Sequence, residues 1–155
     1  MRLTFEFVPR GIRPALGLLL CLAFHSCAGS GIRTNHQIPG GSGDLPFSHV
    51  VQVGKTVYVA GTLGRDSTTG QPPADAGEEA RLVLDGIRAR LELVGLTMDD
   101  LVSVQVFCSD VELYGVFNDV YRTYFDGAYP TRSFIGSGEL LFGCHFEVNG
   151  IAVCP

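Results

Sequence analysis

Arg132 and a row of polar residues near the C-terminus are the side chains best suited to chemistry. Arg132 directly follows Tyr129-Pro130-Thr131 and opens an expected strand in a stretch with almost no other charge. Further along, His145, Glu147 and Asn149 alternate with apolar residues, so they share one face of the last expected strand. A guanidinium and a carboxylate on neighbouring strands could anchor an anionic substrate and orient a water molecule. The alternative is a surface arginine and a solvent-facing polar row, and the residues alone leave both open.

A metal site is the weaker interpretation of the same segment. His145 and Glu147 would lie on one face of a strand, whereas Cys144 would point to the other face. Two donors do not complete a zinc site, so we expect no metal here. The chain contains no Walker loop and no G-x-S-x-G, H-E-x-x-H or C-x-x-C motif. His49 and Lys55, the only lysine, are expected to be ordinary polar residues.

Short apolar runs predict five strands that would position these side chains. Gly54-Lys55 joins the first two runs and is typical of a short hairpin. Asp66, Gly70 and two prolines mark a loop over residues 65–74. The expected strands are His49–Val53, Thr56–Gly61, Val102–Cys108, Thr131–Gly136 and Cys144–Val153.

Two amphipathic helices separate the strands. Asp75 caps the first, with Glu78 as its capping-box partner, and apolar residues recur at helical spacing until Gly95. Asp110 caps the second, whose apolar stripe runs to Tyr124. The order ββαβαββ predicts an α+β fold, a mixed sheet with both helices on one face. The other face would stay exposed in a monomer, so we expect other subunits to cover it.

The first 28 residues have the pattern of a secretory signal peptide. Basic residues precede an apolar run over residues 15–24, which is too short to span a bilayer, and small residues follow. Cleavage after Ala28 would export the protein to the periplasm or beyond. Lipidation at Cys27 is an alternative, and a misassigned start codon, with a cytoplasmic domain beginning near Asn35, is another.

Glycine-rich residues 29–44 are expected to form a flexible linker, and residues 45–155 a single domain. Beyond residue 35 the chain has 15 acidic but only 7 basic side chains, which argues against nucleic acid as a partner. The three cysteines of the domain are an odd set and predict no disulfide framework.

Ordered motifs along the domain resemble the reactive-intermediate deaminase family RidA/YjgF. The likeness spans about residues 45–153, and its most specific parts are the last two motifs. In order, the motifs are Pro46-Phe47-Ser48, Val59-Ala60-Gly61, Glu92-x-x-Gly95, Val104-x-Val106-Phe107, Phe117-Asn118-x-x-Tyr121-x-x-Tyr124-Phe125, Tyr129-Pro130-Thr131-Arg132-Ser133 and Phe146-Glu147-Val148-x-x-Ile151-Ala152-Val153.

The resemblance implies a chorismate-mutase-like fold, assembled as a homotrimer with a site at each subunit interface. It also implies hydrolysis of 2-imino acids and enamines, of the 2-iminopropanoate and 2-iminobutanoate type, to 2-keto acids and ammonia, without a cofactor. Arg132 corresponds to the arginine that binds the substrate carboxylate, and Glu147 to the glutamate that orients water. Gly61 would line the pocket with backbone groups, and Asn118 would give structural support.

Three pocket positions depart from the family pattern. Phe47 stands where the family has Tyr, Ala60 replaces Ser, and Phe134 replaces Cys and would also line the pocket with its backbone. These changes predict a more apolar pocket and a preference for short imino acids. The alternatives are a non-catalytic protein of this fold that binds a small anionic metabolite or a protein partner, and a related enzyme for another small acid or amide.

Overall fold

The computed structural model describes residues 31–40 and 45–155. The expected signal peptide, residues 1–28, lies outside the described residues, as does part of the expected linker. Within the described residues, no helix is both long enough and apolar enough to cross a membrane.

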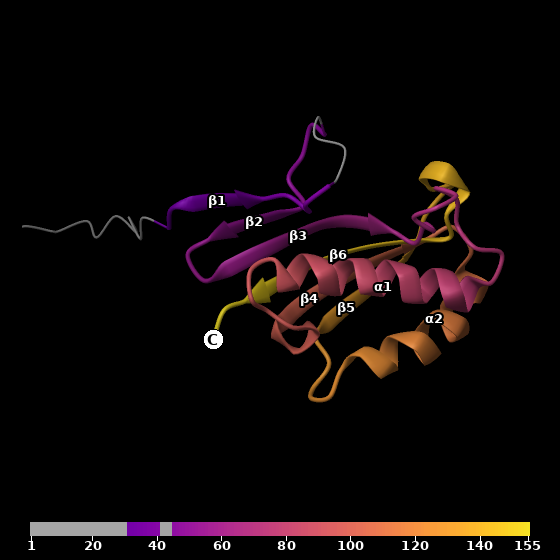
Figure 1. The fold of residues 1–155 in the computed structure, drawn as a ribbon. Coiled ribbons are helices and arrows are strands. Elements are labelled where there is room, and N and C mark those ends of the chain that lie inside the picture. The colour runs from indigo at the N-terminus through magenta and orange to yellow at the C-terminus, as the bar shows by residue number, and fades with distance from the viewer. Residues whose placement is uncertain (1–30, 41–44) are drawn as a thin grey trace, which may run out of the picture.

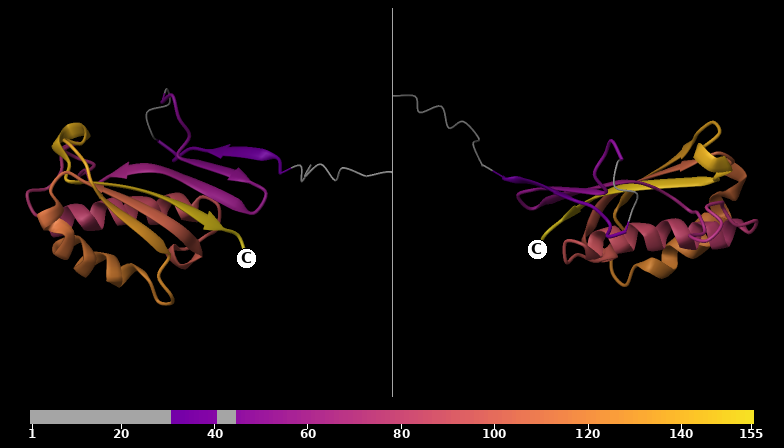
Figure 2. Two further views of the ribbon diagram at one scale, coloured as in Figure 1. Left: turned by 180° about the vertical axis from the view of Figure 1, so that it is seen from behind. Right: turned by 45° about the horizontal axis from the view of Figure 1, so that its top comes forward.

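One mixed sheet with two helices packed on the same face forms the domain (Figures 1 and 2). The helices are α1 (Ala76–Glu92) and α2 (Tyr114–Tyr121), and the strand order across the sheet is β1-β2-β3-β6-β4-β5. The predicted α+β class and the order ββαβαββ from β2 onward are confirmed. The strands are β1 (Arg33–His36), β2 (Val50–Val53), β3 (Thr56–Leu63), β4 (Leu101–Cys108), β5 (Thr131–Gly136) and β6 (Phe146–Val153).

Strand β1 lies where the sequence predicted a flexible linker, so the sheet has six strands instead of five. β1 pairs antiparallel with β2, from Arg33 opposite Val53 to His36 opposite Val50. Its side chains are polar and mostly exposed. Backbone hydrogen bonds at a sheet edge require no apolar alternation, and therefore the sequence pattern does not indicate this strand.

The connections between strands follow from local backbone geometry. Gly54 has a φ of +59° in the turn between β2 and β3, which supports the predicted hairpin. All neighbouring strands are antiparallel except β4 and β5, which are parallel and joined by the crossover through α2. This crossover places β5, and with it Arg132, at the sheet edge opposite β1.

Helix α1 packs against β3 and β6 through the predicted apolar stripe, and the Asp75 carboxylate accepts the backbone N–H of Glu78 at 2.8 Å. The second helix is less regular than predicted: Asp110 caps a 3₁₀ turn, Val111–Leu113, before α2 begins. The buried part of the α1 stripe consists of Ala80, Val83, Leu84, Ile87 and Leu91.

The sheet face opposite the helices, called here the open face, carries exposed apolar side chains, as expected. Tyr58 of β3 is 48% exposed, and Val53 and Val153 are each 39% exposed. Exposed apolar surface of this kind is typical of an interface.

Candidate functional site

Arg132 lies on the side of the sheet that faces the helices. It is paired in register with Val104 of β4, which is buried under the helix layer. One Nη2–H of Arg132 donates to Oδ1 of Asn118 on α2 at 2.7 Å, and the guanidinium carbon lies 4.6 Å from the ring centroid of Tyr121. An amide and an aromatic face therefore fix the orientation of the guanidinium.

The guanidinium borders a cavity of about 300 Å³, called here the arginine cavity. Its hydrogen bond to Asn118 uses one of five N–H donors, which leaves others for an anion. Within the described residues the hydroxyl of Tyr121 has no partner, and burial raises the pKa of Tyr121 to about 12, so the hydroxyl remains a donor at neutral pH. The lining residues are Tyr114, Asn118, Tyr121, Arg122, Tyr129, Pro130 and Arg132.

Glu147 lies on the open face of the sheet. Its neighbours along β6, Phe146 and Val148, are buried toward the helices, and alternation places Glu147 on the opposite side. The β3–β6 register shifts between Val59 and Thr62, which is a bulge that brings Gly61 against Glu147. A Cβ atom at Gly61 would collide with Oε1 of Glu147, so only glycine leaves room for this carboxylate.

Glu147 borders a second cavity of about 460 Å³, called here the glutamate cavity. His49 lines it and contacts Gln37 through both its ring and its backbone N–H. Burial, with a smaller contribution from the charge of Arg90, lowers the pKa of His49, which favours the neutral imidazole. The lining residues are Leu45, Phe47, His49, Gly61, Leu63, Arg65, Arg90, Leu141, Phe142 and Glu147.

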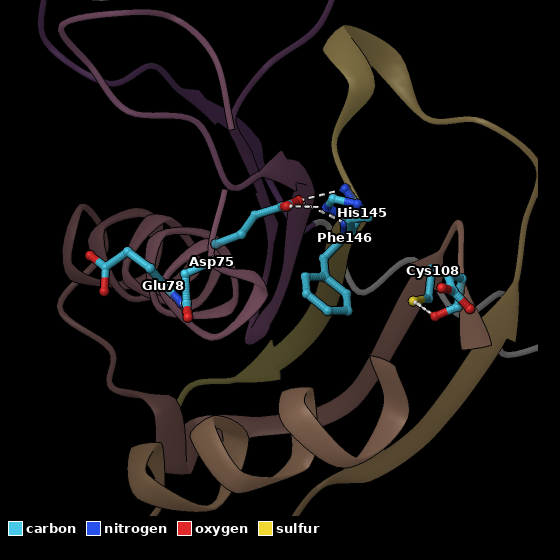
Figure 3. Close-up of polar contacts among 7 residues, drawn as sticks. Asp75, Glu78, Cys108, His145 and Phe146 are labelled. Carbon is cyan, nitrogen blue, oxygen red and sulfur yellow. Dashed lines mark hydrogen bonds and ion pairs between the residues drawn. The ribbon is translucent and has the colours of Figure 1, made fainter. Parts of the chain in front are cut away.

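The fully buried carboxylate of Glu79 fixes the segment that leads into β6. It accepts the backbone N–H groups of His145 at 2.6 Å and Phe146 at 2.9 Å, and it contacts Nδ1 of His145 at 2.7 Å. Figure 3 shows His145 at this contact, with the ring of Phe146 below it in the view. Glu147 is the next residue, so the first turn of α1 helps to set its position.

Sequence reasoning missed Glu79 and Arg90, although a signal exists for both. Each occupies a position within or beside the apolar stripe of α1, three residues after Ala76 and Ile87 respectively. A charged residue at such a position indicates a buried or paired charge. Both side chains lie next to the candidate site.

Two further predicted residues lie outside both cavity linings. Ala60 sits in the bulge of β3 and donates its backbone N–H to the carbonyl of His49 at 3.0 Å. Phe134 packs edge-on against Tyr114 and Phe117, with centroid distances of 5.0 and 5.7 Å. The Phe134 ring therefore lies between the sheet and α2.

The cysteines of the domain are free, and no metal cluster is formed by the described part of the chain. Burial raises the pKa of the Cys108 and Cys144 thiols, which disfavours a nucleophilic thiolate. Residues 31–40 and 45–155 contain no group of three His, Cys, Asp or Glu side chains that could hold a metal ion.

The predicted site residues therefore fall into two sets. Asn118 and Arg132 lie together on the helix side of the sheet. Phe47, Gly61 and Glu147 lie together around the glutamate cavity. Within one chain, the sheet lies between the guanidinium of Arg132 and the carboxylate of Glu147.

Comparison with known proteins matches residues 42–154 to the family described as endoribonuclease L-PSP. The chain is 34% identical over 109 residues to the 2-iminobutanoate/2-iminopropanoate deaminase of Mus musculus, covering 70% of this chain and 81% of that protein. Escherichia coli TdcF, solved with bound serine, superposes with a TM-score of 0.69 at 29% identity, covering 78% of this chain and 94% of TdcF. RidA of the Antarctic bacterium Psychrobacter sp. PAMC 21119 superposes with a TM-score of 0.67 at 28% identity, covering 77% and 94%.

Proposed function

The chain belongs to the RidA/YjgF family of reactive-intermediate deaminases, and from this membership we propose that it hydrolyses small 2-imino acids. In this reaction the oxygen of water forms a bond to the imine carbon. The carbon–nitrogen bond then breaks, the nitrogen leaves as ammonia, and a 2-keto acid remains. The relevant substrates are of the 2-iminopropanoate and 2-iminobutanoate size.

The division of the site between two sheet faces is the observation that carries this proposal. A guanidinium that can bind a carboxylate and a carboxylate that can orient water are both present, but on opposite faces of one sheet. They converge only if Arg132 of one subunit meets Glu147 of the partner subunit. This geometry supports the homotrimer that the family resemblance implies, with the open faces inside and one site at each interface.

Each residue has a defined role in the proposed reaction. Arg132 pairs with both oxygens of the substrate carboxylate, and the amide of Asn118 and the ring of Tyr121 hold its guanidinium in place. Glu147 accepts a proton from water as it attacks and returns a proton to the departing nitrogen. Gly61 keeps the Glu147 carboxylate close to the strand.

Substitutions at Arg132 and Glu147 should have different kinetic effects. Arg132→Lys keeps the charge but loses the bidentate fork, so KM should rise or activity should fall below detection. Glu147→Gln keeps the shape but removes the base, so kcat should fall by ~10²–10⁴-fold. In the assay, an amino-acid oxidase produces the imine, and trapping measures how much imine remains. Purified protein that hydrolyses the imine lowers the trapped amount.

Two exposed residues of α1 provide matched controls. Arg88→Lys and Glu92→Gln make the same chemical changes away from both cavities and should leave the rates unchanged. If wild type accelerates hydrolysis and the site variants match it, the residue assignment is wrong. If wild type shows no acceleration for several imino acids, the deaminase proposal is wrong, and binding of a small carboxylate becomes the better hypothesis.

RNA cleavage, which the family description names, fits this chain poorly. The excess of acidic over basic side chains beyond residue 35 would repel a phosphate backbone.

A further inference from the structure

Arg90 is a partly buried cation without a carboxylate partner among the described residues. Its Nη1–H donates to the carbonyl of Gly86 at 2.9 Å, and its Nε–H is buried without a partner. The other two arginines of α1 are paired: Arg81 with Glu78, and Arg88 with Asp85. An unpaired charge away from water is costly, so a counter-ion is expected for Arg90.

The position of Arg90 directs this charge toward the glutamate cavity. β2 pairs only with Thr56–Val59, so the following part of β3 has a free edge beyond His49. The cavity lies at this edge and is bordered by Arg90 from the helix layer and by Glu147 from the open face. The lowered pKa of His49 means that this neighbour adds no positive charge at neutral pH.

The charges that line the cavity leave an excess of positive charge. Arg65 is the second cation, and its guanidinium stacks on the ring of Phe142 at 4.0 Å. Glu147 is the single carboxylate among the described lining residues. With Arg132 at the same composite site, three guanidinium groups face one carboxylate. A substrate with one carboxylate would neutralise Arg132 and leave Arg90 unpaired.

We propose that Arg90 binds a second anionic group on the substrate, so that short dicarboxylic 2-imino acids are the preferred substrates. This inference rests on the proposed deaminase function and specifies its substrate class. One carboxylate, attached to the imine carbon, pairs with Arg132. The other, at the end of the side chain, pairs with Arg90 inside the glutamate cavity. Charge-assisted hydrogen bonds of this kind provide about 10- to 100-fold in affinity.

Binding of the expected keto-acid products tests the inference without catalysis. Isothermal titration of the full-length protein compares oxaloacetate, which carries two carboxylates, with pyruvate, which carries one. Wild type should bind oxaloacetate at least about tenfold more tightly. Arg90→Leu should abolish the difference and Arg90→Lys should retain part of it. Arg88→Leu, which removes the same charge from an exposed site on the same helix, should leave the difference intact.

Kinetics provide the second readout. The ratio of kcat/KM for the imine of aspartate to that for the imine of alanine should exceed about ten in wild type and fall toward one in Arg90→Leu. Equal ratios in wild type and Arg90→Leu would overturn the inference while the deaminase function stands. A changed sedimentation coefficient of Arg90→Leu with an unchanged ratio would also overturn it, because the counter-ion would then be an acidic residue of a neighbouring subunit. If wild type hydrolyses neither the imine of aspartate nor that of alanine, the proposed function is wrong. The comparison of oxaloacetate binding with pyruvate binding then tests the inference by itself.

Discussion

Gly61 is the residue whose replacement should separate catalysis from folding most cleanly. A methyl group at this position would displace the Glu147 carboxylate, while the bulge in β3 already tolerates irregular backbone. Gly61→Ala should therefore lower kcat by about 10- to 100-fold, because a displacement of about 1 Å is enough to misalign a catalytic group. The imine-trapping assay measures the rate, and circular dichroism checks the fold.

Gly138→Ala is the matched control, because a Cβ atom there meets nothing within 4 Å. A Gly61→Ala protein with wild-type kcat would show that Glu147 does not need its present position. Residue type and motif context both indicate Arg132 and Glu147 in the sequence, and their catalytic roles stay predictions. Arg90 could be predicted only in part: its place beside the apolar stripe indicates a buried or paired charge, but the absence of a partner among the described residues is visible only in three dimensions.

At the scale of elements, the junction between α1 and β6 depends on one buried carboxylate. Glu79→Leu would leave the N–H groups of His145 and Phe146 without an acceptor in a buried position. We expect a loss of about 2–5 kcal/mol in the free energy of unfolding. Glu79→Gln retains an oxygen acceptor for these N–H groups and should lose clearly less. Urea denaturation measures both, and equal losses in the two variants would contradict this role.

The elements themselves were predictable to different degrees. The α1 stripe and the strands from β2 onward follow from periodicity, because each buries one apolar face. β1 pairs with β2 through its backbone and its side chains are mostly exposed, so its sequence carries no such pattern. The long apolar stripe predicted after Asp110 is divided in the structure into 3₁₀ turns and the short helix α2, since packing rather than propensity sets these boundaries.

At the scale of the whole molecule, the open face of the sheet should determine assembly. Tyr58→Asp places a charge at a position that is 48% exposed in one chain, so it should dissociate the proposed trimer without unfolding the subunit. Val116→Asp makes a comparable change at a position 41% exposed on α2 and should leave the trimer intact. Sedimentation equilibrium should give three times the chain mass for wild type, and a wild-type monomer at micromolar concentration contradicts the assembly.

The sequence predicts a covered sheet face more readily than it predicts that Arg132 and Glu147 lie on opposite faces of the sheet. Exposed apolar strands predict a covered face, but strand alternation had to be combined with the observed register before Arg132 and Glu147 could be assigned to opposite faces. Register depends on pairing between strands that are far apart in the sequence. The alternation of apolar and polar residues along one strand does not show which strands become its neighbours.

The separation of Arg132 and Glu147 by one sheet has a genetic consequence. Mutations at the two positions would complement each other although both lie in one gene, because each proposed site takes one residue from each of two subunits. Alleles that lose either residue would be null when expressed alone. Expressed together in equal amounts, they would form mixed trimers in which about one site in four joins two unaltered residues. Two copies of one allele that carries both changes would form no intact site, because every subunit would lack both residues.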